Sequence, residues 1–274
     1  MHKLHPDASL RDAVDVAELH ATLIDMVRTW FATRAEVLPT PYGRILRDLE
    51  HPLVYDANLA WVDRVPEGGP IAVLADLDRA FSGTDVRHRF VFFADAQEAY
   101  DHQEAFASAG FRPQAELVMA KVGLPACIVN PDVVVKEVPP DAGNEDFRRV
   151  QLAVSAESGY AQEESRQVYE VERAKGTALG ERAYVGYLRG KVAATVSVWP
   201  RGNFALIGSV ATLPEFRMQG VGRTMVFDAC REAINLRCEY SLLTTDLFDT
   251  PRAMYKTLGF EPVGELRGFL RPPA

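Results

Sequence analysis

The first 125 residues alternate between helix-like and strand-like spacing of apolar positions. An amphipathic helix is predicted over 10–31, and Pro39, Pro41 and Gly43 interrupt the pattern after it. Shorter patterns then predict strands at 53–62, 89–93 and 111–122, and helices at 71–81 and 97–109. The second of these helices is expected to end at Gly110, because glycine commonly terminates helices.

A segment containing Gly, Asn and two prolines, residues 123–131, separates this region from a second set of periodic segments. The second set predicts strands at 133–138, 183–188, 192–199, 204–212, 240–245 and 260–270, and helices at 146–158, 163–174, 220–236 and 250–258. Arg189-Gly190 is the expected turn of a β-hairpin. The chain is therefore expected to form two domains of α/β class with mixed sheets, over 1–125 and 132–274.

The stretch from Val210 to Thr224, VATLPEFRMQGVGRT, joins a predicted strand to a predicted helix through a glycine-containing turn. The first N–H groups of a helix lack intrahelical partners, and together with the helix dipole they attract an anion such as phosphate. Gly220 and Gly222 have no Cβ, so a ligand can approach the main chain closely. The predicted phosphate-binding residues are Arg217, Met218, Gln219, Gly220, Val221, Gly222, Arg223 and Thr224.

Three other interpretations compete for this stretch. A Walker loop would need GxxxxGK[ST], which is absent. A dinucleotide-binding turn would need a third glycine where Met225 stands, together with a ribose-binding acid. The third alternative is a tight loop that only leads into a core helix.

The order of predicted elements and two motifs resemble the GNAT acyltransferase superfamily. Arg217-Met218-Gln219-Gly220-Val221-Gly222 is similar to that family's pyrophosphate loop, and Tyr255-Lys-Thr-Leu-Gly259-Phe260 to its closing motif. The resemblance covers roughly residues 132–271 and implies a GNAT fold that uses acetyl-CoA as co-substrate. It also implies that Val210, Ala211 and Thr212 bind the pantetheine arm, with the N–H of Val210 on the thioester oxygen.

The closing motif has a counterpart in the first half of the chain. Residues 106–117 align with 255–266 at a constant offset of 149, so that Gly, Phe, Pro, Glu and Leu coincide. Phe106 takes the place of Tyr255, and the first half lacks any Arg-x-x-Gly-x-Gly. We interpret residues 1–125 as a degenerate GNAT-like half that shapes the acceptor pocket; chance similarity of two helix–glycine–strand corners is the alternative.

The resemblance places Tyr255 at the general-acid position of the family. A phenol has a reference pKa near 10 and a thiol one of about 8.5, so Tyr255 can lend a hydrogen bond to a departing thiolate. No base is evident, because all six histidines lie at or before His102. Glu157, Glu163 and Glu164 are weak candidates, and a water chain or an amine of low pKa is an equal one.

Two further positions near the closing motif lack a clear functional role in the sequence. Asp246 and Asp249 are expected as turn and cap residues. The family often has Asn where this sequence has Phe248, and the sequence therefore departs from one usual cofactor contact.

Charge and composition narrow the function further. The net charge of −8 disfavours nucleic-acid binding and docking on an anionic membrane. Residues 1–125 carry 12 Lys and Arg against 19 Asp and Glu, whereas residues 126–274 carry 18 against 19. The three cysteines form no disulfide framework or metal motif, and no apolar run is long enough to span a bilayer, so a cytoplasmic protein without a bound metal is expected.

The leading interpretation is an acetyl-CoA-dependent N-acetyltransferase that acts on the amine of a small molecule or peptide. Its two-half layout resembles that of mycothiol synthase and of small-amine acetyltransferases. The acidic first half favours a cationic acceptor, although solubility explains the same charge. A catalytically silent acyl-CoA-binding protein is the alternative from another class, and the first half serving as a homodimerisation surface is a third possibility.

Overall fold

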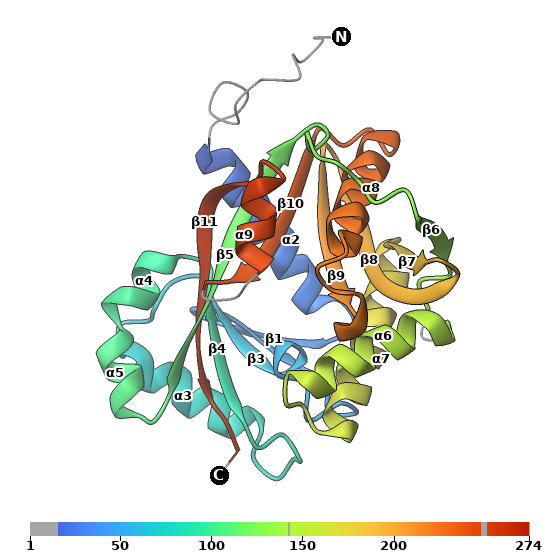
Figure 1. Ribbon diagram of the computed structural model, residues 1–274. Helices are drawn as coiled ribbons and strands as arrows, with labels where there is room; N and C mark the ends of the chain where they lie inside the picture. The colour runs from blue at the N-terminus through green and yellow to red at the C-terminus, as the bar shows by residue number, and fades with distance from the viewer. Residues whose placement is uncertain (1–15, 142, 248–250, 274) are drawn as a thin grey trace. The chain divides into compact units, whose positions relative to one another are not determined.

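The computed structural model describes residues 16–141, 143–247 and 251–273 (Figure 1). Contacts between Cα atoms divide the described chain into two compact units. One unit contains Ile24–Leu117 and the chain from Glu265 onward; the other contains Val118–Gly264 and the part of the first helix that ends at Leu23. Two long strands, β5 (Arg112–Val122) and β11 (Glu261–Arg271), are neighbours, and each runs from one unit into the other.

The N-terminal unit is a mixed sheet covered by short helices. Its strand order is β1-β2-β3-β4-β11, in which β3 and β4 are parallel and the other pairs antiparallel. The elements that it contributes are α2 (Val16–Ala32, shared with the other unit), β1 (Glu36–Thr40), β2 (Gly43–Arg47), η1 (Tyr55–Ala57), β3 (Leu59–Val62), α3 (Gly69–Ala80), β4 (Arg89–Phe93), α4 (Ala96–Asp101) and α5 (Gln103–Ser108).

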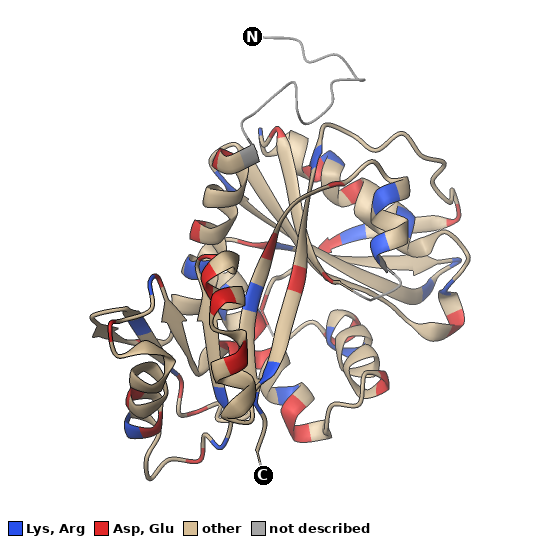
Figure 2. Cartoon of the chain, turned by 90° about the vertical axis from the view of Figure 1, so that its left-hand side faces the viewer, with Lys and Arg blue, Asp and Glu red and all other residues tan. Residues whose placement is uncertain are grey.

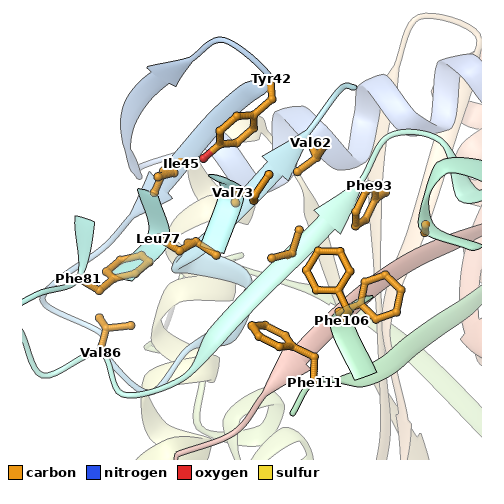
Figure 3. Packing of buried hydrophobic residues seen from close by; sticks show 14 residues of the cluster. Tyr42, Ile45, Val62, Val73, Leu77, Phe81, Val86, Phe93, Phe106 and Phe111 are labelled. Carbon is orange, nitrogen blue, oxygen red and sulfur yellow. The ribbon is translucent and has the colours of Figure 1, made fainter. Parts of the chain in front are cut away.

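Aromatic rings make up much of the core of the N-terminal unit (Figure 3). The ring of Phe106 is fully buried and stacks on Phe269, with ring centroids 4.4 Å apart and an angle of 4° between the planes. Phe93 and Phe111 contact the same ring edge-on. Burial of each such ring removes apolar surface from water and stabilises this unit by roughly 2–3 kcal/mol.

All eleven strands of the described residues belong to one sheet, and those of the C-terminal unit follow the order β5-β10-β9-β8-β7-β6. The pairs from β6 to β9 are antiparallel, and β10 lies parallel to β9. Its elements are β6 (Val133–Val138), α6 (Glu145–Glu157), α7 (Gln162–Leu179), β7 (Arg182–Leu188), β8 (Lys191–Arg201), β9 (Phe204–Thr212), η2 (Pro214–Phe216), α8 (Val221–Asn235), β10 (Tyr240–Asp246) and α9 (Pro251–Thr257). Positive and negative residues are interspersed along the helices (Figure 2).

Helices cover both faces of the strands in this unit. Phe147 of α6 and Tyr169 of α7 pack on Ala183 and Val185 of β7. A Cβ on the next residue of β7, Gly186, would lie 2.4 Å from the sulfur of Met225 in α8. Successive residues of a strand point to opposite faces, so α8 lies on the face opposite α6 and α7.

Most elements predicted from the sequence are confirmed, and so is the α/β class with mixed parallel and antiparallel strands. Strands β4, β6 and β9 have the predicted bounds. The structure extends the second helix of the C-terminal unit to Leu179. The part of the first predicted helix before residue 16, together with Phe248, Asp249 and Thr250, lies outside the described residues.

Three predictions about the N-terminal unit are wrong. The strand predicted over 53–62 begins only at Leu59, because η1 occupies Tyr55–Ala57. Residues 36–47 form a hairpin rather than a break, because β1 lies at the edge of the sheet, where Pro39 removes no inner ladder bond. The helix predicted over 97–109 is two helices, α4 and α5. His102 between them leaves the helical conformation, with φ −109° and ψ 6°.

Candidate active site

The C-terminal end of β9 contains a β-bulge at Ser209 and Val210. The register between β8 and β9 passes from Ser197↔Gly208 to Thr195↔Ala211, so two residues of β9 lie opposite one residue of β8. Ser209 has a φ of +49°, a value that non-glycine residues rarely adopt. The bulge takes the backbone of Val210 out of the regular ladder, at the position predicted to contact the thioester oxygen.

Strands β9 and β10 are joined only at their N-terminal ends. Among the described residues, their parallel register covers Tyr240–Leu242 of β10 against Phe204–Leu206 of β9. The remaining parts of the two strands, up to Thr212 and Asp246, are outside this register. Backbone groups of β9 beyond the shared ladder are therefore positioned to pair with an extended ligand, as an added strand does.

The loop after β9 leads directly into the N-terminus of α8. Gly220 is the N-cap residue, in the left-handed conformation with φ +75°. Thr224 donates its N–H to the Gly220 carbonyl, so the N–H groups of Val221, Gly222 and Arg223 lie in the first turn, before that intrahelical bond. These amides and the dipole of a 15-residue helix form the positive end that the sequence predicted for a diphosphate.

The outer side of the loop is open. The side chains of Met218, Gln219 and Arg223 are exposed, and Met218 has a left-handed φ of +59°. Gly222 lies under the end of β9, where a Cβ would come within 3.3 Å of Thr212 Oγ1. The structure therefore brings together Thr212 and Gly222 at the end of β9, while Arg223 extends outward.

Asn130, in the segment between the predicted domains, holds this loop in place. Its Nδ2 donates to the carbonyl of Gln219 at 2.7 Å, and its backbone N–H donates to Thr224 Oγ1 at 2.9 Å. The Thr224 hydroxyl in turn donates to the Gly220 carbonyl. Sequence reasoning treated 123–131 as a linker and missed this role; the Asn before Pro131 was the only local signal.

Arg217 forms a two-pronged ion pair with Glu157 at the end of α6. The two N–O distances are 2.7 and 2.5 Å, and Arg217 Nε also donates to the Thr212 carbonyl. The hydrogen bonds from Arg217 lower the pKa of Glu157 below its usual value. Arg217, which is predicted to bind phosphate, is thus held beside the end of β9 by Glu157. An anion bound on the loop would share the guanidinium with Glu157.

Tyr255 lies in α9, with its side chain 5% exposed. Its ring meets Phe260 edge-on, with centroids 6.0 Å apart, and its carbonyl accepts the N–H of Phe260. A Cβ on the intervening Gly259 would lie 3.2 Å from Lys121 Cε. The helix–glycine–strand corner predicted for the closing motif is therefore present.

The weak candidates for a general base differ in their surroundings. Glu163 is exposed, and hydrogen bonds from Arg166 and then Gln167 lower its pKa to about 2. Glu164 is half-buried in the first turn of α7, and Asp246 is exposed at the end of β10. Glu157 and Glu163 are thus both engaged by arginines, which makes them poor proton acceptors near neutral pH.

Two further observations on the described part of the chain concern metal ions and membrane-spanning helices. Within 16–141, 143–247 and 251–273, no three His, Cys, Asp or Glu side chains are grouped so that they could hold a metal ion. None of the helices there is long and apolar enough to cross a membrane.

Comparison with known proteins identifies the C-terminal fold. Residues 148–260 match the model of the acetyltransferase (GNAT) family. No curated protein matches the sequence.

Several solved structures share the fold of nearly the whole chain. A GCN5-related N-acetyltransferase from Kribbella flavida is 16% identical, with a TM-score of 0.69, over 93% of this chain and 96% of its own. A functionally unknown conserved protein from Staphylococcus epidermidis is 14% identical, with a TM-score of 0.69, over 88% of this chain and 96% of its own.

A third similar structure is described as a tandem GNAT protein from the clavulanic acid biosynthesis pathway. It is 17% identical, with a TM-score of 0.54, over 93% of this chain and 97% of its own. At such low identities these three structures show a shared fold alone. The family match at residues 148–260 includes β9, the loop after it and α8. The part of the chain that is similar to the acetyltransferase (GNAT) family is therefore residues 148–260.

Proposed function

We propose that this chain transfers the acetyl group of acetyl-CoA directly to the amine of a small molecule or peptide. The observation that carries the proposal is the convergence of three features at one end of β9: the bulge at Val210, the separation of β9 from β10, and the first-turn amides of α8. Each feature suits one part of the thioester, namely the carbonyl, the pantetheine arm and the diphosphate.

The loop residues bind and orient the donor. The amides of Val221, Gly222 and Arg223 face the diphosphate, and the N–H of Val210 donates to the thioester oxygen. When the amine nitrogen attacks the carbonyl carbon, negative charge develops on that oxygen, and this N–H stabilises it. The C–S bond then breaks, and the leaving sulfur takes a proton from the hydroxyl of Tyr255.

The proton that leaves the amine goes to solvent through water. This assignment follows from the arginine partners of Glu157 and Glu163, which keep both carboxylates poorly basic. An acceptor amine with a low pKa fits such a site, because a larger fraction of it is neutral at neutral pH. Such an acceptor needs little help from a base.

A second candidate function is a silent protein that binds acyl-CoA without turnover. The pairing of both glutamates with arginines favours it. Incubation with acetyl-CoA and a panel of small amines and basic peptides separates the two functions, with released thiol as the readout. Amine-dependent thiol release supports the enzyme, and binding of acetyl-CoA without it supports the silent protein.

The donor site is tested by calorimetry with a pair of isosteric variants. A Cβ on Gly220 would lie 3.6 Å from the Cβ of Asn130, an ordinary contact, so both Asp and Asn fit there. Both also tolerate a positive φ better than most residues do. We expect Gly220→Asp to weaken acetyl-CoA binding about tenfold more than Gly220→Asn, because only Asp places a negative charge beside the diphosphate. Equal affinities of the two variants would contradict the proposed site.

A further inference from the structure

A polar network of side chains reaches from α7 to Ser209 in the bulge of β9. The side chain of Arg173 in α7 is only 2% exposed. Its Nη1 donates to Glu181 Oε2 at 2.9 Å, and its Nη2 donates to Ser209 Oγ at 2.9 Å. Its guanidinium also lies over the ring of Phe147, 4.7 Å from the centroid. One buried guanidinium thus links α7 to the bulge.

The backbone carbonyl of Ser209 is held as firmly as its hydroxyl. It accepts hydrogen bonds from Gln151 Nε2 and from Thr195 Oγ1, each at 2.9 Å. Gln151 also donates to Thr195 Oγ1 at 2.7 Å, so the two donors support each other. Ser209 therefore has partners on α6, α7 and β8 for its two oxygens.

A glycine in α7 leaves space for the carboxylate of this network. A Cβ on Gly176 would lie 2.2 Å from Glu181 Oε2, so only glycine at this turn of α7 leaves room for the carboxylate. The side chain of Glu181 is buried. Burial raises the pKa of Glu181, while Arg173 acts in the opposite direction. A buried ion pair of this kind contributes little net stability compared with apolar packing, and its directional bonds are better suited to fixing a conformation.

Ser209 needs such support, because a left-handed φ is unfavourable for a residue other than glycine. We propose that Arg173 is a positioning residue, which holds Ser209 in the bulge and thereby aims the N–H of Val210 at the acetyl carbonyl. The inference rests on the proposed function, since it assigns a purpose to the bulge in binding the thioester. Arg173 itself does not touch the substrate.

The test compares two ligands that differ only at the acetyl group. Acetyl-CoA carries the carbonyl oxygen that the N–H of Val210 would bind, whereas CoA lacks it. Calorimetry of the full chain gives the ratio of the two affinities, and loss of global stability alone would not move this ratio. We expect Ser209→Ala to lower the affinity for acetyl-CoA relative to CoA by about three- to tenfold, the loss of about one net hydrogen bond.

Two other variants sharpen the test. Ser158→Ala removes a hydroxyl that donates to the Val154 carbonyl at the end of α6, and the ratio is expected to stay unchanged. Arg173→Lys keeps the charge beside Glu181 but lacks the second arm that reaches Ser209, so it is expected to lower the ratio as Ser209→Ala does. Because both changes break one link, the double variant Ser209→Ala/Arg173→Lys is expected to be no worse than either single variant.

The outcomes distinguish the positioning role of Arg173 from the proposed function on which it rests. If the wild-type chain binds both ligands and Ser209→Ala leaves the affinity ratio unchanged, the positioning role of Arg173 is wrong while the donor site stands. Additive effects in the double variant would likewise contradict a shared link. If the wild-type chain binds neither ligand, the proposed function itself fails.

Discussion

Phe106 and Tyr255 occupy equivalent positions in two copies of one helix–glycine–strand corner. In each copy the residue five positions later donates its N–H to the carbonyl of the aromatic residue, from Phe111 to Phe106 and from Phe260 to Tyr255, both at 3.0 Å. The glycine between them has a φ of 81° in the first copy and 82° in the second. The corner is therefore a repeated backbone structure, and the two copies differ in the hydroxyl that only Tyr255 carries.

The first copy uses its ring for packing alone, since Phe106 is fully buried against Phe269. We predict that Tyr255→Phe, which gives the second copy the same side chain, lowers kcat about 100-fold. The affinity for acetyl-CoA should change less than twofold, because Phe keeps the edge-on contact with Phe260 while the leaving thiolate loses its proton donor. Released thiol measures turnover, and calorimetry measures affinity.

A parallel fall of kcat and affinity in Tyr255→Phe would assign the tyrosine to packing. Thermal unfolding serves as the control, because a role in packing would also lower Tm.

The ion pair between Arg217 and Glu157 predicts a gain of affinity on removal of the carboxylate. An anion on the loop competes with Glu157 for the guanidinium, and both side chains are exposed to solvent. We expect Glu157→Gln to tighten acetyl-CoA binding about two- to fivefold at low ionic strength, with a smaller effect in 0.5 M salt. The measurement is calorimetry at two salt concentrations.

Glu163→Gln is the matched control for this prediction. It removes a carboxylate that pairs with Arg166 within α7, and it should leave the affinity unchanged. Weaker binding in Glu157→Gln would instead mean that the ion pair holds the loop in its binding conformation.

The loop anchor Asn130 predicts a loss of donor affinity from a residue that carries no charge. Asn130→Ala removes the bond to the Gln219 carbonyl and leaves the loop less well ordered. Part of the binding free energy is then used to order the loop. We expect acetyl-CoA to bind about three- to tenfold more weakly. Asn203→Ala, which removes an exposed amide contact with Glu239, is the control; equal effects of the two variants would exclude an anchoring role.

The sequence predicts the regular elements of this chain well, because each depends on local periodicity. Strand β9, the loop and α8 were all predicted from about thirty consecutive residues, with the helix start placed at Gly220, one residue before the observed start. The hairpin of β1 and β2 was missed because Pro39 suggests a break unless the strand is known to lie at an edge.

The supports of the site depend on contacts between distant residues, which no local pattern contains. Asn130 is 89 and 94 positions away from its partners in the loop. Arg173 lies in the charged helix α7 and Glu181 just after it, a composition that usually indicates a solvated face, yet both side chains are buried. The bulge at Ser209 depends on the register between β8 and β9, which the sequence of either strand leaves open.

In the N-terminal unit, burial of His88 predicts a dependence of stability on pH. Burial lowers the pKa of His88 to about 4, while its Nε2 lies 3.1 Å from the carbonyl of Asn58 and its ring lies against Tyr55. In the unfolded chain the pKa returns to about 6.5, so between pH 6.5 and pH 4 the unfolded state binds the proton and the folded state does not. The free energy of unfolding should therefore fall as the pH is lowered through this window, by up to about 3 kcal/mol from this residue.

In His88→Gln, whose amide can still donate to the Asn58 carbonyl, urea unfolding between pH 7.5 and 5 should show a shallower dependence on pH than in the wild type. Identical slopes for the two proteins would mean that His88 titrates alike in the folded and unfolded chains.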